Sequence, residues 1–201
     1  MTTQPLRLAA LISGSGSTLQ NLLDCRDRGQ LDILVPLAIA DRDCTGIQRA
    51  EARGVPVVLL SRKRLSAEEF SSQVFSRLRN EPVELVGLAG FLSQLIIPPD
   101  FENRVMNIHP ALIPAFCGAG MYGQRVHQAV LDRGCRITGC TVHFADNEYD
   151  HGPILVQKCV PVLPDDTAKT LSARVFEAEC IAYPEAIRDF ASRLHRSAAA
   201  R

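Results

Sequence analysis

The chain has 201 residues, of which 46% are hydrophobic, and this length and composition suit one domain of ordinary size with its own core. Lysine plus arginine and aspartate plus glutamate both number 22, so the charge balance provides neither the basic field that favours nucleic acid nor the acidic excess of a disordered chain. No apolar run approaches the length of a membrane span and residues 1–7 do not resemble a secretory leader, so we expect a cytoplasmic protein with small-molecule partners.

The seven cysteines form an odd set that contains no C-x-x-C pair. This pattern argues against a disulfide framework and against a four-ligand zinc site. Most of these thiols are expected to be small, buried, apolar groups. Cys117 lies in a loop that contains glycine, and we expect it to be the most exposed and reactive of the seven.

The N-terminal segment predicts a strand, a tight turn and a helix. Residues 6–13 are mostly apolar, the turn 14–18 follows at once, and helical spacing then appears at Leu19, Leu22 and Leu23. Glycine in such a turn lets the backbone approach an anion, and the free N–H groups at the start of the helix can bind it. The turn lacks the third glycine of the dinucleotide fingerprint and the lysine of a Walker A loop. The motif alone therefore allows either a phosphate site or a simple turn.

Strands and helices alternate through the first half of the chain. The pattern predicts further strands at residues 33–40, 55–60 and 83–88, with helices at 45–53 and 66–79. This alternation predicts an α/β fold with a doubly wound, mostly parallel sheet flanked by helices. Ligands on such sheets collect at the carboxyl ends of the strands, where the turns at Gly14 and Gly90 and the side chain of His109 are expected.

Residues 105–110 read as the end of a buried strand that opens into a site. Side chains alternate along a strand, so Asn107 and His109 should point to one side while Ile108 points into the core. An asparagine amide can donate to an oxygen that gains negative charge, and a histidine can exchange a proton near neutral pH. Taken alone, the pair is more often structural than catalytic.

A long glycine-rich loop follows at residues 114–123, and such loops are often mobile lids or binding loops. Residues 126–133 are predicted to be helical, with His127 at the surface. Strands are expected at residues 137–144 and 154–162, and a last helix at about 164–193. Acidic side chains in the turn 146–153 and on that helix are by default solvated.

Three stretches, residues 107–114, 139–144 and 150–154, resemble the signature of the folate-dependent formyltransferases in order and spacing. The resemblance extends from Leu11 to Pro184. It implies a single domain over residues 1–201 with a Rossmann-like formyltransferase fold. The N-terminal half would bind the phosphate-bearing ribonucleotide, and the C-terminal half would bind folate and carry the catalytic residues.

The implied activity is transfer of a formyl group from 10-formyltetrahydrofolate to the amine of glycinamide ribonucleotide, in purine synthesis, without a metal. Asn107 would bind the oxyanion, His109 would stabilise it and move a proton, and Asp150 would orient His109 and raise its pKa. The partners would be these two small molecules, with no nucleic acid or membrane, and the protein would be a monomer or homodimer.

The resemblance also implies a set of binding residues. The ribonucleotide and its phosphate would contact Gly14, Gly16, Ser17, Thr18, Gly90 and Glu179. Folate would contact Phe91, Leu92, Leu95, Ala145, Asp146 and Tyr149, and His143 would support the catalytic residues. Relatives commonly carry arginine and an aliphatic residue where Ser93 and Gln94 stand, and often glutamine in place of Phe176, so these positions depart from the family pattern.

Three alternatives stay open from the sequence. The first is another formyl chemistry on the same core: hydrolysis of 10-formyltetrahydrofolate, or transfer to an amino sugar or to methionyl-tRNA. The hydrolase and tRNA enzymes carry an additional domain for which this chain is too short. The second is a folate-binding protein without activity, and the third is a generic mononucleotide-binding domain.

Overall fold

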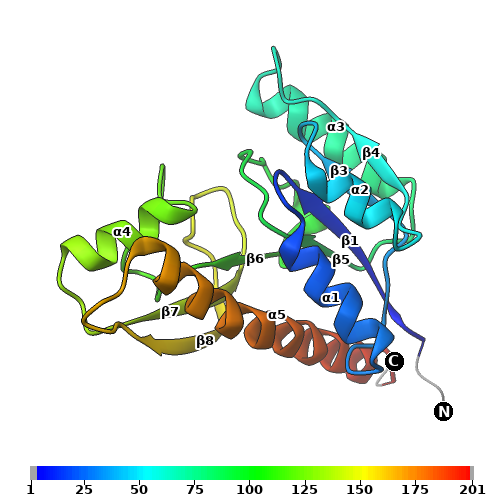
Figure 1. The fold of residues 1–201 in the computed structure, drawn as a ribbon. Coiled ribbons are helices and arrows are strands. Elements are labelled where there is room, and N and C mark those ends of the chain that lie inside the picture. The colour runs from blue at the N-terminus through cyan, green and yellow to red at the C-terminus, as the bar shows by residue number, and fades with distance from the viewer. Residues whose placement is uncertain (1–3, 200–201) are drawn as a thin grey trace. The chain divides into compact units, whose positions relative to one another are not determined.

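A computed structural model describes residues 4–199 of the chain (Figure 1). Contacts group the chain into two compact units. The first comprises the chain up to Met106 together with the segment that begins at Ile187, and the second comprises Asn107–Ala186. The prediction of one domain over residues 1–201 stays a prediction. Each unit is described by itself below.

A parallel sheet forms the centre of the first unit. Its middle strand, β1 (Leu6–Ile12), pairs with β3 (Ala38–Ala40) on one side and with β5 (Leu85–Leu88) on the other. Beyond β3 lies β4 (Val57–Leu59), and the short β2 (Ile33–Leu34) pairs with the start of β1. Next to β5 lies β6 (Val105–His109), whose first two residues belong to this unit. Six of the seven residues of β1 are buried, as expected for a strand covered on both faces.

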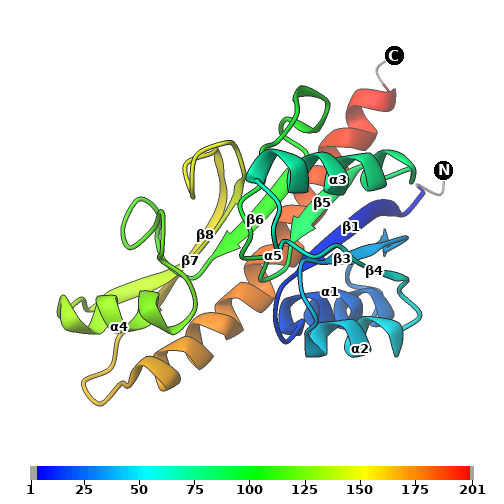
Figure 2. The same ribbon diagram turned by 90° about the horizontal axis from the view of Figure 1, so that it is seen from above.

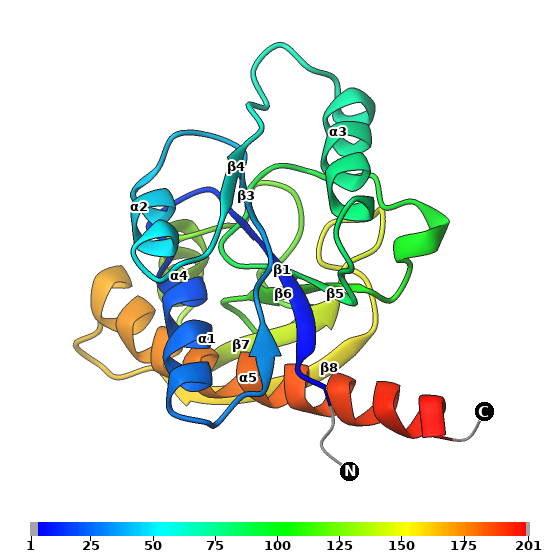
Figure 3. The same ribbon diagram turned by 90° about the vertical axis from the view of Figure 1, so that its right-hand side faces the viewer.

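Helices cover both faces of this parallel sheet. Helices α1 (Ser17–Asp27) and α2 (Thr45–Glu51) lie on one face and α3 (Ala67–Arg79) lies on the other (Figures 2 and 3). The predicted apolar stripes are buried, at Leu19, Leu22 and Leu23 on α1 and at Phe70, Val74 and Leu78 on α3. A capping box begins α3, because Ser66 Oγ accepts the Glu69 N–H while Glu69 accepts the Ser66 N–H. The predicted doubly wound α/β class is confirmed.

One predicted strand is divided in two. The sequence predicted a continuous strand over residues 33–40, whereas the structure has β2 and β3 with Pro36 between them. Proline has no backbone N–H and interrupts a strand ladder, so pairing with β1 resumes only at Leu37 and Ala38. The other predicted elements of this unit differ at their ends by a few residues.

The second unit contains the antiparallel part of the sheet. Strand β7 (Ile137–Phe144) lies between the end of β6 and the edge strand β8 (Ile154–Pro161), with which it pairs antiparallel. The β7–β8 register shifts between Val142 and His143, an irregularity that can re-aim a side chain. Helix α4 (Gln124–Asp132) lies in this unit, and α5 (Ala168–Ala199) begins here and ends in the first unit.

His127 on α4 corrects one prediction. The sequence placed this histidine at the surface, but it is 2% exposed, and its Nδ1 is buried without a hydrogen-bond partner among the described residues. It lies between Val126 and Val130, both of which are completely buried. Because residues three apart share a helix face, its position three residues before Val130 was the signal that could have predicted its burial.

Candidate active site

Strand β6 delivers Asn107 and His109 to a cluster of polar groups in the second unit. Asn107 Nδ2 lies 3.1 Å from His143 Nε2 and 3.4 Å from Asp150 Oδ1. His109 Nδ1 lies 3.4 Å from Asp150 Oδ2. The four predicted catalytic and supporting residues are therefore brought together. Ile108 was predicted to be a core residue, but it is only half-buried, whereas His109 is 3% exposed.

Asp150 is the centre of this cluster. One of its carboxylate oxygens faces Asn107 and His143, and the other faces His109 and accepts the Gly118 N–H at 2.9 Å. Its backbone has φ 54°, in the left-handed region that non-glycine residues seldom adopt. Strained backbone of this kind is often found at functional sites, where the surrounding structure holds it in place.

Backbone carbonyls select the proton position on both histidines. His109 Nε2 lies 2.9 Å from the Phe116 carbonyl, and His143 Nδ1 lies 2.9 Å from the Phe144 carbonyl. A carbonyl oxygen only accepts, so each of these ring nitrogens carries the hydrogen. In the tautomer that carries its hydrogen on Nδ1, His143 presents a lone pair on Nε2, which accepts an N–H of the Asn107 amide.

Opposing effects determine the pKa of His109. Burial lowers the pKa of His109 below its ordinary value of 6.5, although the Asp150 carboxylate and the Phe116 carbonyl both act in the opposite direction. Asp150 therefore acts in the predicted direction, but burial, which the sequence does not display, has the larger effect and sets the net direction of the pKa shift. Burial also acts to raise the pKa of Asp150, but the charge of His109 and the Gly118 N–H act against it, and the pKa lies below 3.8.

Two contacts in this cluster come from the loop at residues 114–123. The Phe116 carbonyl and the Gly118 N–H are backbone groups, and Phe116 has φ 51°. Because any residue type carries these atoms, no sequence signal identified them. Cys117, between them, is half-buried and donates to the Pro114 carbonyl. The prediction that Cys117 would be the most exposed cysteine was wrong, because Cys159 is the exposed one. Burial also raises the pKa of the Cys117 thiol, which acts against reactivity.

The predicted phosphate turn lies in the first unit. Gly16 precedes α1 with φ 72° and provides no side-chain cap, so the helix begins with backbone N–H groups that no N-cap side chain satisfies. The turn packs on the start of α2, where the Gly46 N–H donates to the Gly14 carbonyl at 3.0 Å. A Cβ on Gly16 would lie 2.8 Å from Gly46 Cα, so this backbone contact requires glycine. Ser17 and Thr18 are the first two residues of α1 after the Gly16 cap.

The predicted folate residues lie in two segments. In the first unit Phe91 stacks on Phe70 with ring centroids 6.2 Å apart, Leu92 is exposed and Leu95 is buried. The Leu92 N–H donates to Ser13 Oγ at 2.8 Å, and the Ser13 N–H donates to the Gly90 carbonyl. These bonds place the segment beside the end of β1. In the second unit Tyr149 is exposed, Ala145 is half-buried, and Asp146 pairs with the exposed His151.

Glu179 on α5 is not an ordinary surface charge. The residue is partly buried, and burial raises the pKa of its carboxyl to about 8. It therefore binds a proton near neutral pH unless a ligand provides a partner. Among residues 4–199, no group of three or more histidine, cysteine, aspartate or glutamate side chains is arranged to hold a metal ion.

The fold and the polar cluster define an α/β protein whose site combines an amide donor, an imidazole and a carboxylate, the groups that suit transfer at a carbonyl carbon. A family model described as "Formyl transferase" matches residues 6–187. The chain belongs to this formyl transferase family.

Relatives named for glycinamide ribonucleotide chemistry match over nearly the whole chain. A chloroplastic phosphoribosylglycinamide formyltransferase of Vigna unguiculata is 38% identical over 193 residues, which cover 93% of this chain and 61% of the relative. Glycinamide ribonucleotide transformylase 1 of Symbiobacterium toebii superposes with a TM-score of 0.87 at 38% identity, covering 95% of this chain and 90% of that one. Phosphoribosylglycinamide formyltransferase of Brucella melitensis superposes with a TM-score of 0.83 at 35% identity, covering 94% and 96%.

The chain spans only 61% of the Vigna unguiculata relative and 64% of a chloroplastic phosphoribosylglycinamide formyltransferase of Arabidopsis thaliana, so it corresponds to part of their length. In the part of the chain that the structure describes, no helix combines the length and the apolar character needed to cross a membrane.

Proposed function

We propose that this protein transfers a formyl group from 10-formyltetrahydrofolate to the amine of glycinamide ribonucleotide. The observation that carries the proposal is the Asp150 carboxylate, which lies within 3.4 Å of both the Asn107 amide and the His109 imidazole. Formyl transfer forms a bond between the amine nitrogen and the formyl carbon and breaks the bond from that carbon to N10. One proton passes from the amine to N10, and the formyl oxygen carries negative charge in between.

Asn107 would donate to this oxygen. Its amide is oriented by His143, which accepts one N–H at 3.1 Å, while the contact of the amide with Asp150 is longer, at 3.4 Å. The longer hydrogen bond is the weaker one, so this N–H is the one available for exchange. The developing oxyanion would replace the carboxylate at this N–H while His143 keeps the amide in its orientation, so that the donor is already in place when charge develops.

His109 would carry the proton and stabilise the charge of the oxyanion. In the present arrangement its Nε2–H is bound by the Phe116 carbonyl, and its Nδ1 faces Asp150. The loop at residues 114–123 would therefore have to shift the Phe116 carbonyl before Nε2 could contact a substrate. Asp150 would remain on Nδ1 and stabilise the imidazolium formed during the reaction.

The binding residues named from the family resemblance remain part of this proposal. The uncapped N–H groups at the start of α1 would hold the phosphate of the ribonucleotide, and Glu179 would contact the same substrate. The segment from Phe91 to Leu95 and the turn at residues 145–149 would bind the folate. We further propose that no metal is required, so treatment with a chelator should leave the activity unchanged, and that the protein is cytoplasmic and a monomer or homodimer.

A spectrophotometric assay of tetrahydrofolate release, with and without glycinamide ribonucleotide, tests the activity. Release should require the ribonucleotide in the wild type and should be lost in His109→Ala, whereas His195→Ala, at a histidine of the first unit, should behave as the wild type. Release without any acceptor would instead indicate a hydrolase. Absence of release from the wild type with this acceptor would refute the proposal and direct the search to amino-sugar acceptors.

A further inference from the structure

A buried carboxylate lies at the carboxyl edge of the parallel sheet in the first unit. Asp41 directly follows β3, and its side chain is 0% exposed. Its N–H donates to the Ile12 carbonyl at the end of β1, and its own carbonyl accepts the Arg62 N–H. Asp41 is therefore fixed where β1 and β3 both end, at the edge where sheets of this class bind their ligands.

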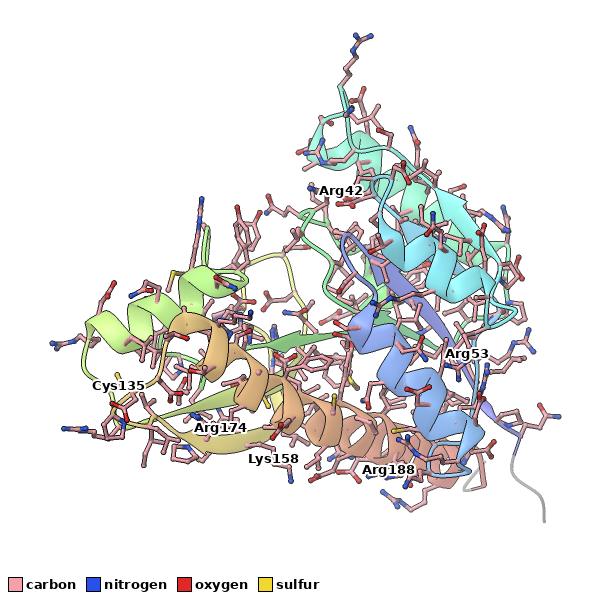
Figure 4. All side chains as sticks on the ribbon, in the orientation of Figure 1. Arg42, Arg53, Cys135, Lys158, Arg174 and Arg188 are labelled. Carbon is pink, nitrogen blue, oxygen red and sulfur yellow. The ribbon has the colours of Figure 1, made fainter. Side chains whose placement is uncertain are left out.

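Both oxygens of this carboxylate bind the side chain of Arg42. Arg42 Nε lies 3.0 Å from Oδ1 and Nη2 lies 3.0 Å from Oδ2, and Ser93 Oγ donates to Oδ2 at 2.6 Å. Two parallel N–H bonds fix the plane of a guanidinium. The Arg42 side chain nevertheless remains 50% exposed, and Figure 4 labels it in the segment that joins β3 to α2. The buried Asp41 thus holds an exposed cation in one orientation.

The surroundings of this cation combine apolar and basic groups. Ser93 follows Phe91, which stacks on Phe70, and the exposed Leu92. The Arg62 guanidinium lies 5.7 Å from the Phe70 ring centroid, and its Nη1 donates to the Leu65 carbonyl. Phe70 is completely buried, so the aromatic pair is core packing, and the apolar side chain that this segment exposes is Leu92.

We propose that Arg42 is a specificity-determining residue that binds an oxyanion of a substrate, namely a carboxylate of the glutamate tail of the folate. This inference rests on the proposed function. The phosphate of the ribonucleotide offers the same chemistry, but the start of α1, which has no side-chain cap, already suits a phosphate. Asp41, which binds Arg42, accepts instead from Ser93 in the predicted folate segment.

Equilibrium binding to Arg42→Gln tests the proposal, with tetrahydrofolate compared with tetrahydropteroate, which has the same ring system but no glutamate. The variant should weaken tetrahydrofolate binding by about tenfold or more, as expected for a lost hydrogen bond to a charged group, and should bind tetrahydropteroate as the wild type does. Arg79→Gln is the matched control, because Arg79 also forms a two-point contact with an aspartate, Asp100, at 2.8 Å and 2.8 Å. It should change neither affinity.

Two further experiments identify which substrate carries the oxyanion and check that the variant is folded. Glycinamide ribonucleotide is compared with its riboside, which lacks the phosphate, and a loss confined to the ribonucleotide would overturn the assignment to folate. Because Arg42→Gln leaves a buried carboxylate unpaired, the double variant Asp41→Asn/Arg42→Gln should restore the thermal stability while keeping the weak tetrahydrofolate binding.

The behaviour of the wild type distinguishes failure of the Arg42 assignment from failure of the proposed formyl transfer. If the wild type binds tetrahydrofolate and transfers formyl groups while Arg42→Gln binds all four ligands normally, only the role of Arg42 is refuted. If the wild type binds no folate, the proposed function fails as well.

Discussion

The amide of Asn107 is oriented without a substrate, because the Phe144 carbonyl selects the tautomer of His143 and Nε2 of that tautomer accepts from the amide. A donor held in this way costs no reorganisation when charge develops on the substrate. Rotation of the amide by half a turn would place its oxygen against the lone pair of His143, so the alternative orientation is disfavoured.

Asn107→Ala should therefore lower kcat by roughly a hundredfold to a thousandfold, the usual effect of removing one oxyanion donor, with a small change in KM. Steady-state kinetics would measure both constants. Gln128→Ala is the control, because it removes a surface amide of α4 from the same unit. A loss confined to KM would show that Asn107 only binds the substrate.

Strand alternation sufficed to predict that Asn107 and His109 point to the same side, and both lie beside Asp150. The pKa direction of His109 was not predictable in the same way, because the burial that lowers it comes from chain segments far from residue 109. His127 was misplaced for a related reason. Its residue type favoured the surface, whereas its place on the apolar stripe of α4 determined its burial.

At the scale of elements, the loop at residues 114–123 contacts the polar cluster through two backbone groups, the Phe116 carbonyl and the Gly118 N–H. Gly118 donates to Asp150 with φ 94°, and Gly120 has a similar φ of 83°. A Cβ at either position would meet no atom within 4 Å. The two glycines therefore carry the same conformational demand, and it is the Gly118 N–H that binds Asp150.

Gly118→Ala should disturb the Asp150 contact and lower kcat by about tenfold, whereas Gly120→Ala should have a much smaller effect. The two variants should lose similar stability, about 1 kcal/mol each. Pre-steady-state formyl transfer and urea unfolding would separate the two quantities. Equal rate losses in both variants would mean that loop strain, rather than the Asp150 contact, limits turnover.

The contact between the turn at residues 14–18 and α2 leads to a second prediction at this scale. A Cβ on Gly46 would lie 2.8 Å from the Gly14 carbonyl oxygen and 3.1 Å from Gly16 Cα, and both are backbone atoms that cannot rotate away. Gly46→Ala should destabilise the fold by about 1 to 3 kcal/mol and raise KM for the ribonucleotide more than KM for the folate. Thr45→Ala, at the exposed neighbouring position, should change neither KM.

The order and type of nearly all elements could be predicted from the sequence, because the parallel strands are apolar and the helices carry clear stripes. The division between β2 and β3 could also have been predicted, since Pro36 lies between them. The contacts of the loop could not, because they depend on φ values of glycine and Phe116 that no residue pattern specifies.

For the whole molecule, two buried histidines link stability to pH. Burial lowers the pKa of His127 below 6.5, with a further contribution from His109, whose pKa is lowered by burial as well. The unfolded chain then binds more protons than the folded chain between the lowered pKa values and 6.5. The stability that these groups contribute is present above about pH 6.5 and is lost as the pH falls through their folded-state values.

The urea concentration at the unfolding midpoint should therefore decrease as the pH is lowered from about 7.5 to about 5.5. His127→Gln should make this decrease smaller. His151→Gln offers a control of opposite sign. The Asp146 carboxylate raises the pKa of the exposed His151, so this group stabilises the fold below pH 6.5 and loses its effect as the pH rises. A dependence on pH that His127→Gln leaves unchanged would assign it to other groups.

The path of α5 has a consequence for how the molecule is made. The first unit needs residues from both parts of the chain, because Ile187 is completely buried and Arg188 donates to the Gln30 carbonyl in that unit. Residues are synthesised in order, so residues 107–186 are made before the end of α5. Until then the nascent N-terminal sheet lacks the part of α5 that completes its unit. During that interval, the first unit is incomplete and is the part of the nascent chain that a chaperone would be expected to hold.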